Sequence, residues 1–147
     1  MDKKTGLRAI WAEGRASLNG WCSIGNPFTA EIMAAQGFDS LTVDMQHGAL
    51  DYSDLLPMLQ AMRASGAALL ARVPWLDPAH VMKALDAGCD GIICPMISTA
   101  DEAARLVRYM RYPPDGERSS GPTRAVYAHG KDYAVRANAS VMAFAMI

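Results

Sequence analysis

Apolar and polar residues follow one another in blocks that predict strands and helices in turn. Apolar runs bounded by glycine, proline or asparagine predict strands at 18–24, 40–44, 67–73, 90–95 and 141–147. Apolar residues at helical spacing, with capping and terminating residues, predict helices at 7–13, 29–35, 51–64, 78–88, 100–110 and 131–138. We interpret one apolar stripe on the helix at 51–64 as part of the core. It consists of Leu55, Met58, Leu59 and Met62.

The predicted strands are almost continuously apolar, as is typical of a parallel sheet that is buried on both faces. Strands alternating with helices place the chain in the α/β class. Two architectures fit 147 residues: a (β/α)₈ TIM barrel truncated after about the fifth strand, or a five-stranded doubly wound sheet. No closing helix follows the apolar run at 141–147, which favours the truncated barrel. The irregular segment 111–122 is interpreted as an active-site or interface loop.

Composition and charge narrow the possible partners. The chain is 51% hydrophobic and 20% charged with a net charge of -1, so it is globular and has no field to attract nucleic acid or an anionic membrane. No apolar run is long enough for a transmembrane helix or resembles a signal peptide. The cysteines fit no zinc pattern, and Cys22 and Cys94 are expected to be buried. These features predict a cytoplasmic protein.

Three ionisable residues fall where parallel α/β folds place their chemistry, at the carboxyl ends of strands. Asp44 ends the second predicted strand, His47 follows three residues later, and Arg72 ends the third. We expect their functional groups to lie at one edge, within reach of a bridging water. A carboxylate can orient an imidazole and raise its basicity, and an arginine can bind a carboxylate or enolate oxygen. Together they predict proton transfer next to a carbonyl on a small anion.

Simpler explanations exist for each of these residues. An aspartate at a strand end is often a turn residue and a lone histidine is often merely exposed, whereas Arg72 at the end of an apolar strand requires a partner. His80, on a helix, and His129, in a loop, we interpret as surface residues. No nucleotide-binding glycine motif and no G-x-S-x-G motif occurs. No lysine lies in a predicted strand, which favours a metal ion over a Schiff base as the electrophile.

Several motifs, in order along the chain, resemble those of the HpcH/HpaI aldolase family. The segment 43–48, VDMQHG, resembles the family's D-x-E/Q-H motif, with Gln46 in place of the commoner glutamate. The segment from Arg72 to Pro78 resembles its R-x-x-x-x-D-P motif. LDAG at 85–88, ICPM at 93–96 and RYPPDGER at 111–118 continue the resemblance over essentially the whole chain.

The resemblance implies a class II, metal-dependent aldolase on a (β/α)₈ barrel. Such enzymes make or break a bond between the enolate of a 2-oxo acid, such as pyruvate or hydroxypyruvate, and an aldehyde. His47 would be the base, acting with a metal-bound water, and Asp44 would orient it or the water network. Arg72 would bind the keto acid and stabilise the enolate, and Trp21 would line the pocket. Asp86 matches a family aspartate that lies near a neighbouring subunit's site. Proteins of the family are typically homo-oligomers, most often hexamers.

The same resemblance makes residues 1–147 the N-terminal part of a single aldolase barrel domain. The family's divalent metal, such as Mg, Mn or Co, is held by a glutamate and an aspartate that would lie beyond Ile147, so no metal ligand is expected in this chain. The 147 residues alone are therefore expected to be inactive. The alternative is a non-catalytic domain of doubly wound type that binds a small molecule or a protein.

Overall fold

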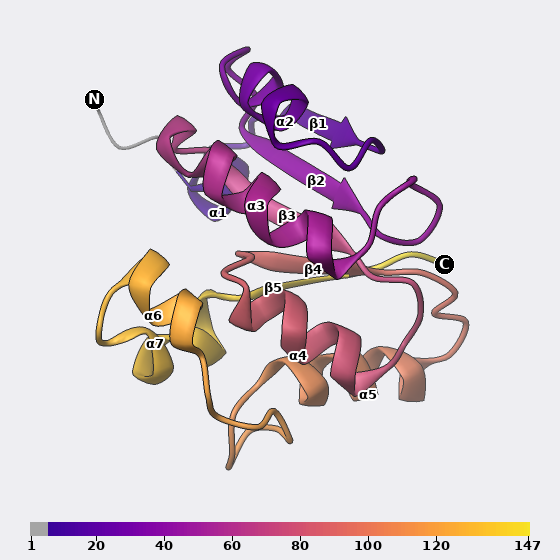
Figure 1. The fold of residues 1–147 in the computed structure, drawn as a ribbon. Coiled ribbons are helices and arrows are strands. Elements are labelled where there is room, and N and C mark those ends of the chain that lie inside the picture. The colour runs from indigo at the N-terminus through magenta and orange to yellow at the C-terminus, as the bar shows by residue number, and fades with distance from the viewer. Residues whose placement is uncertain (1–5) are drawn as a thin grey trace.

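The computed structural model describes residues 6–147 and contains one five-stranded parallel sheet. Its spatial order follows the sequence: β1 (Asn19–Cys22), β2 (Ser40–Asp44), β3 (Ala68–Arg72), β4 (Gly91–Cys94) and β5 (Met142–Ala145). Each strand pairs in parallel with the next, so all carboxyl ends lie at one edge of the sheet (Figure 1). We call this the carboxyl edge.

One helix precedes the first strand, and the others connect successive strands. In chain order they are α1 (Leu7–Ala12), α2 (Pro27–Ala34), α3 (Tyr52–Met62) with a short 3-10 turn η1 (Arg63–Ser65), α4 (Pro78–Asp86), α5 (Ala100–Met110), α6 (Thr123–His129) and α7 (Tyr133–Ser140). Two of them, α3 and α5, begin with a capping box, in which the N-cap residue and the third helical residue each accept, through the side chain, a hydrogen bond from the other's backbone amide. Among residues 6–147, no helix is long and apolar enough to cross a bilayer.

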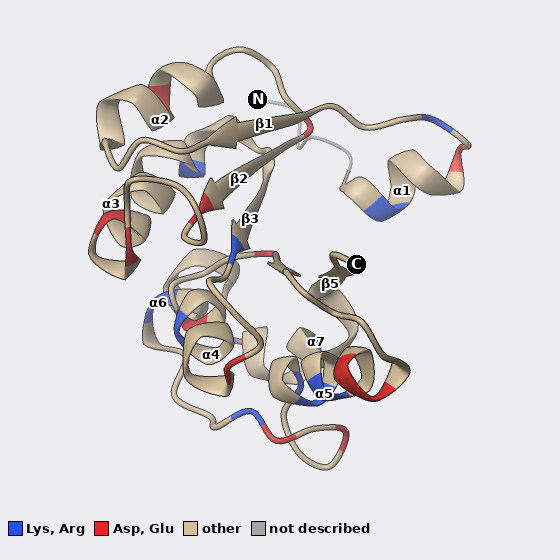
Figure 2. Ribbon diagram, turned by 90° about the vertical axis from the view of Figure 1, so that its right-hand side faces the viewer, with Lys and Arg blue, Asp and Glu red and all other residues tan. Residues whose placement is uncertain are grey.

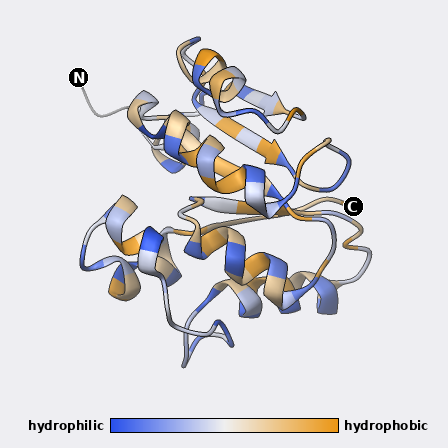
Figure 3. Cartoon of the chain, in the orientation of Figure 1, coloured by the Kyte–Doolittle hydropathy of each residue, from blue (hydrophilic) through white to orange (hydrophobic). Residues whose placement is uncertain are grey.

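The main core lies between the sheet and the helices that cover its outer face (Figure 3). Because side chains alternate along a strand, Leu41 and Val43 of β2 point into this core and both are fully buried. The predicted stripe on α3 packs here too, and all four of its side chains are fully buried: Leu55, Met58, Leu59 and Met62. The three cysteines are also buried, which confirms the prediction for Cys22 and Cys94.

The other face of the sheet is divided between polar and apolar residues. On β1 and β2, the side-chain oxygen of Asn19 accepts hydrogen bonds from Ser40 at 2.8 Å and Thr42 at 3.1 Å. Further along the sheet, a smaller apolar cluster joins α1 to β3 and β5 through Leu7, Ile10, Leu70 and Met142. The polar residues of this face continue along β2 to Asp44 at the carboxyl edge.

The strand order excludes the doubly wound alternative. A doubly wound sheet reverses its strand order at a switch point, whereas here the five strands follow the sequence from one side to the other. Strands added in sequence, with the connecting helices over one face, are the arrangement of a (β/α)₈ barrel. The structure therefore matches the barrel prediction.

The prediction was wrong about α6 and His129. The segment 123–129 is a helix, and His129 is its last residue rather than part of a loop. The His129 ring is half-buried: its Nε2 lies 3.1 Å from the Gly88 carbonyl oxygen, and it stacks on Tyr133 with ring centroids 5.3 Å apart. The sequence gives little sign of α6 because no side chain caps its N-terminus, which follows Pro122. His80 is exposed on α4, as predicted.

Candidate active site

A buried ion pair joins the carboxyl ends of β2 and β3. Asp44 and Arg72 are register partners, and Figure 2 shows the acidic and basic strand ends side by side. Arg72 Nε donates to Asp44 Oδ1 at 2.7 Å and Nη2 donates to Oδ2 at 2.6 Å. Both residues are at least nine-tenths buried, with 9% of Arg72 and 2% of Asp44 exposed. This fork geometry is the strongest kind of arginine–carboxylate contact.

Three further groups donate to the Asp44 carboxylate. They are the Trp21 indole at 3.3 Å and the backbone amides of Gln46 at 3.1 Å and His47 at 3.3 Å. Burial by itself raises the pKa of Asp44, but the hydrogen bonds from Arg72, His47, Trp21 and Gln46 outweigh it and hold that pKa well below its usual range. Asp44 is therefore a permanent carboxylate at neutral pH, and it fixes its neighbours rather than exchanging protons.

Arg72 is fixed by Asp44 but keeps one nitrogen for other use. The hydrogen bond to Asp44 raises the pKa of Arg72, and burial opposes this only in part. Its guanidinium carbon lies 5.1 Å from the centre of the Trp21 ring. The remaining nitrogen, Nη1, lies 3.8 Å from the Met146 sulfur, which is a weak acceptor. An oxygen of a bound anion would be a better partner for Nη1 than this thioether.

His47 lies on the loop that follows β2, with an exposed side chain. The loop presses on the end of β2 at Gly48, where an added Cβ would collide with the Asp44 carbonyl oxygen. The Ala49 amide then donates to the Ser23 carbonyl oxygen at 2.9 Å, which ties the loop to the chain after β1. His47 is thereby placed at the same edge as Asp44 and Arg72.

The contact between Asp44 and His47 differs from the expected one. Within residues 6–147, the hydrogen bond between them runs from the His47 backbone amide to the carboxylate, and none is formed by the imidazole. Asp44 thus positions the loop rather than the tautomer of the ring. The imidazole is left exposed to whatever binds at the edge.

Trp21 and Asp86 occupy different ends of the molecule. Trp21 lies on β1 beside the ion pair with 42% of its surface exposed, so it can contact a ligand there. Asp86 ends α4, away from the carboxyl edge, and accepts a hydrogen bond from Arg118 Nη2 at 2.7 Å. Burial lowers and the bond to Asp86 raises the pKa of Arg118, and the net shift is upward. In this chain Asp86 is outside the candidate site.

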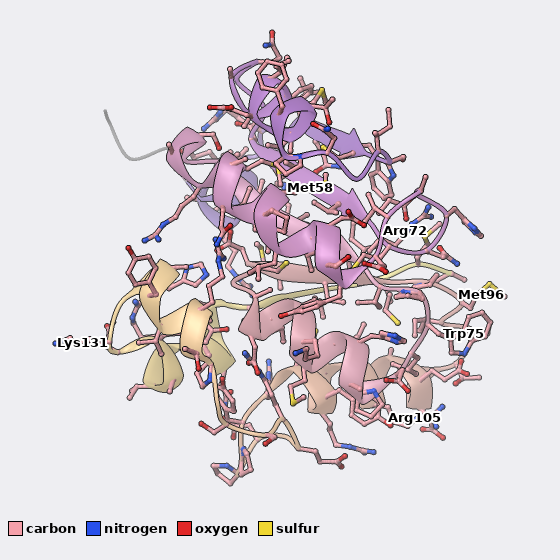
Figure 4. All side chains as sticks on the ribbon, viewed as in Figure 1. Met58, Arg72, Trp75, Met96, Arg105 and Lys131 are labelled. Carbon is pink, nitrogen blue, oxygen red and sulfur yellow. The ribbon has the colours of Figure 1, made fainter. Side chains whose placement is uncertain are left out.

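Other residues at this edge were given no site role by sequence reasoning, although the motifs contain them. Trp75 and Met96 follow β3 and β4 and are more than half exposed, beyond Arg72 in Figure 4. Met96 has a φ of 58°, and among residues 6–147 it is the one non-glycine residue with a positive φ. Gln46 Oε1 is buried with no hydrogen-bond partner among those residues, so it can accept from a ligand or a water. The motif at 43–48 pointed to Gln46, whereas no sequence signal predicts the backbone of Met96.

The residues at this edge do not form a metal-ligand set. The part of the chain that the structure describes contains no group of three or more His, Cys, Asp or Glu side chains placed to hold a metal ion. Both oxygens of Asp44, the nearest carboxylate to Arg72, are engaged by the guanidinium. A divalent ion at this edge would need ligands other than these residues.

Asp44→Asn is expected to lower the free energy of unfolding of the intact protein at pH 7 by about 3–5 kcal/mol, because it leaves the buried Arg72 without its counter-charge. The folded pKa of Asp44 is depressed, so its stabilisation is complete above the unfolded value of about 3.9 and is lost as pH falls through the lower folded pKa. Denaturant unfolding at pH 7 and between pH 4 and pH 2 measures both effects.

The matched control is Asp132→Asn, which breaks an exposed pair with Arg136. It is expected to change stability far less, because exposed pairs contribute little. Equal losses in the two variants, or an unchanged acid limb in Asp44→Asn, would contradict the stabilising role of the buried pair.

The parallel sheet is built in the strand order of an α/β barrel. It carries a charged pair and an exposed histidine at the carboxyl edge, where such barrels place their functional groups. The sequence model of the HpcH/HpaI aldolase/citrate lyase family matches residues 19–147, and the chain belongs to this family. The resemblance drawn from the motifs is thereby confirmed.

The chain is similar to several named aldolases. It is 40% identical over 141 residues to a hydroxypyruvate/pyruvate aldolase of Rhizorhabdus wittichii, covering 96% of the chain and 56% of that protein. It is 42% identical over 117 residues to a 4-hydroxy-2-oxovalerate aldolase of Rhodococcus jostii, covering 78% of the chain and 45% of that protein. The chain spans about half the length of the curated relatives it matches.

A solved structure supports the same fold. An HpcH/HpaI aldolase/citrate lyase family protein from Burkholderia cenocepacia matches with a TM-score of 0.85 and 35% identity. The match covers 95% of this chain and 58% of the other. The sheet described above therefore corresponds to part of that protein's fold.

Proposed function

We propose that this protein is a 2-oxo-acid aldolase, an aldehyde-lyase that joins or separates a pyruvate-type enolate and an aldehyde. The observation that carries the proposal is the guanidinium of Arg72, which Asp44 holds in a fork at the carboxyl edge while Nη1 keeps only a thioether partner. The names of the two relatives support pyruvate or hydroxypyruvate as the donor acid.

Arg72 is proposed to bind the keto acid and stabilise the enolate. Its fork is held before any substrate arrives, so its orientation need not change during the reaction. An enolate carries negative charge on the former carbonyl oxygen, and a permanently charged arginine donates most strongly to that state. Trp21, beside the guanidinium and partly exposed, is proposed to line the pocket.

His47 is proposed to be the base. In cleavage it would take the proton of the aldol hydroxyl as the carbon–carbon bond breaks, which releases the aldehyde and leaves the electron pair in the enolate. In the other direction it returns that proton to the new hydroxyl group. Its exposed side chain at the carboxyl edge supports this role. Asp44 is proposed to act through these two residues, by holding the Arg72 fork and the His47 amide.

A divalent ion, Mg, Mn or Co, belongs to the proposal through the family, which is generally metal dependent. No step is assigned to it, because residues 6–147 do not form a ligand set. The proposal also includes a cytoplasmic homo-oligomer, a hexamer by resemblance, in which Asp86 lies near a neighbouring subunit's site. Sedimentation of the intact protein measures the assembly.

The function is tested by an aldol assay of the intact protein. Pyruvate and hydroxypyruvate are offered with a panel of aldehydes, in the presence of each divalent ion or of a chelator. We expect carbon–carbon bond formation with at least one pair, and loss of turnover in the chelator. No product from any pair with any ion would contradict the proposal, and full activity in the chelator would contradict its metal dependence.

Residues 1–147 alone are expected to lack aldol turnover and to associate in solution. In the described sheet, β1 and β5 each have a neighbour on one side only, so their outer backbone groups can pair with another chain. Sedimentation velocity and the aldol assay on the isolated 147 residues check this. A monodisperse, cooperatively unfolding monomer would contradict the expected association, and aldol turnover would contradict the expected inactivity.

A further inference from the structure

A hollow lies at the opposite end of the molecule from Arg72. It has a volume of about 550 Å³ and is lined by Gln60, Arg63, Thr123, Arg124 and Tyr127. These residues come from the end of α3, from η1 and from α6, on the side of Figure 1 away from the strand arrowheads. The proposed catalytic residues take no part in it.

Arg63 is held across the gap between η1 and α6. Its Nη2 donates to the carbonyl oxygens of Tyr127 at 3.0 Å and Ala128 at 3.3 Å. Its guanidinium carbon also lies 5.0 Å from the centre of the Tyr127 ring. These contacts fix the orientation of the guanidinium but leave its charge without a carboxylate: none of the ion pairs found in residues 6–147 includes Arg63.

Arg124 places a second positive charge in the same hollow. Its Nη1 donates to the Ala87 carbonyl oxygen, and it too has no ion pair within the described residues. Burial, and next the charge of Arg63, lower the pKa of Arg124. The other groups that act on Arg124 are the Cys89 thiol and the Tyr52 hydroxyl, so no carboxylate offsets the repulsion. A bound anion would offset it.

We propose that this hollow binds a small phosphorylated molecule. Two guanidinium groups, with the Thr123 hydroxyl and the Gln60 amide on the same lining, supply donors that suit the several acceptor oxygens of a phosphate group. The volume is in the range of about 300–1,000 Å³ that small-molecule sites occupy. Tyr127, a residue that is 77% exposed, offers its ring for apolar contact with the rest of the bound ligand.

Calorimetric titration of the intact protein with pyrophosphate tests the proposal. We expect saturable binding that weakens as salt is added, because exposed charges are screened. Arg63→Gln is expected to weaken binding about 10- to 100-fold, as loss of a charge-assisted hydrogen bond does. Gln60→Glu is expected to weaken it at least as clearly, because it brings a negative charge to the lining.

Arg105→Gln is the control, and Gln60→Glu is a second variant that does not depend on the contacts of Arg63. Arg105→Gln removes an exposed arginine of α5, outside the hollow, and should leave binding unchanged. Arg63 also holds the end of α6, so circular dichroism must show that Arg63→Gln is folded. Should that variant unfold, Gln60→Glu, an exposed helical position, decides alone. No pyrophosphate binding, unchanged binding in Gln60→Glu, or equal loss in Arg105→Gln would overturn the proposal.

Discussion

Arg72→Ala is expected to lower kcat/KM for the aldol reaction by about 10²–10³-fold, the loss seen when one donor to a developing oxyanion is removed. The side chain is proposed to bind the keto acid and to stabilise the enolate, so both KM for the keto acid and kcat should change. Steady-state kinetics of the intact protein, with keto acid and aldehyde varied separately, measure the two effects. An effect confined to the KM for the aldehyde would contradict the assigned role.

Arg72→Lys separates charge from geometry. Lysine keeps the positive charge beside Asp44 but cannot reproduce the two parallel bonds at 2.7 and 2.6 Å. We expect it to fold more stably than Arg72→Ala, which leaves Asp44 buried without a counter-charge, and yet to show much of the loss in kcat/KM. Arg105→Ala, on the exposed face of α5, is the matched control and should keep wild-type kinetics.

His47→Ala is expected to reduce aldol turnover by about 10²–10⁴-fold, the usual contribution of a general base, while leaving binding of the proposed divalent ion unchanged. Its stability should change little, because the side chain is exposed and its amide, which the substitution retains, makes the bond to Asp44. Turnover at saturating keto acid and thermal unfolding are the two measurements.

His80→Ala is the control for this variant. His80 is also exposed, but it lies on α4 with Asp77 as its neighbour, at 3.7 Å. We expect wild-type turnover from it. Activity of His47→Ala within a few-fold of wild type would remove His47 from the proposed mechanism.

The fold could be predicted closely where local and tertiary preferences agree. The strand at 40–44 and the helix at 100–110 have the predicted limits in β2 and α5. All residues of β2 are buried, so its apolar run has one interpretation, and α5 begins with Thr99 and Glu102 in a capping box. In contrast, α6 has no side-chain cap and is held by long-range contacts from Arg63 and Arg124, which no local pattern reveals.

The place of Asp44 and Arg72 at the carboxyl edge was predictable from the sequence, but the contacts of the candidate site were not. The need of Arg72 for a partner could be inferred from the sequence, and parallel strands bring their ends together. That Asp44 is the partner follows from the β2–β3 register, which pairs these two residues and is a property of the whole sheet. The thioether of Met146 beside Nη1 lies 74 positions further along the chain, and sequence spacing carries no sign of it.

The loop that carries His47 is tied down at both sides of that residue. The Asp44 carboxylate binds the amides of Gln46 and His47, and Ala49 pairs with the chain after β1 through the Ser23 carbonyl oxygen. A segment held in this way resembles the end of a strand more than a mobile lid, and its amide hydrogens should exchange slowly with solvent. The backbone that carries the imidazole is then in position before substrate binds, and we expect closure of this loop to make no contribution to the rate of the proposed reaction.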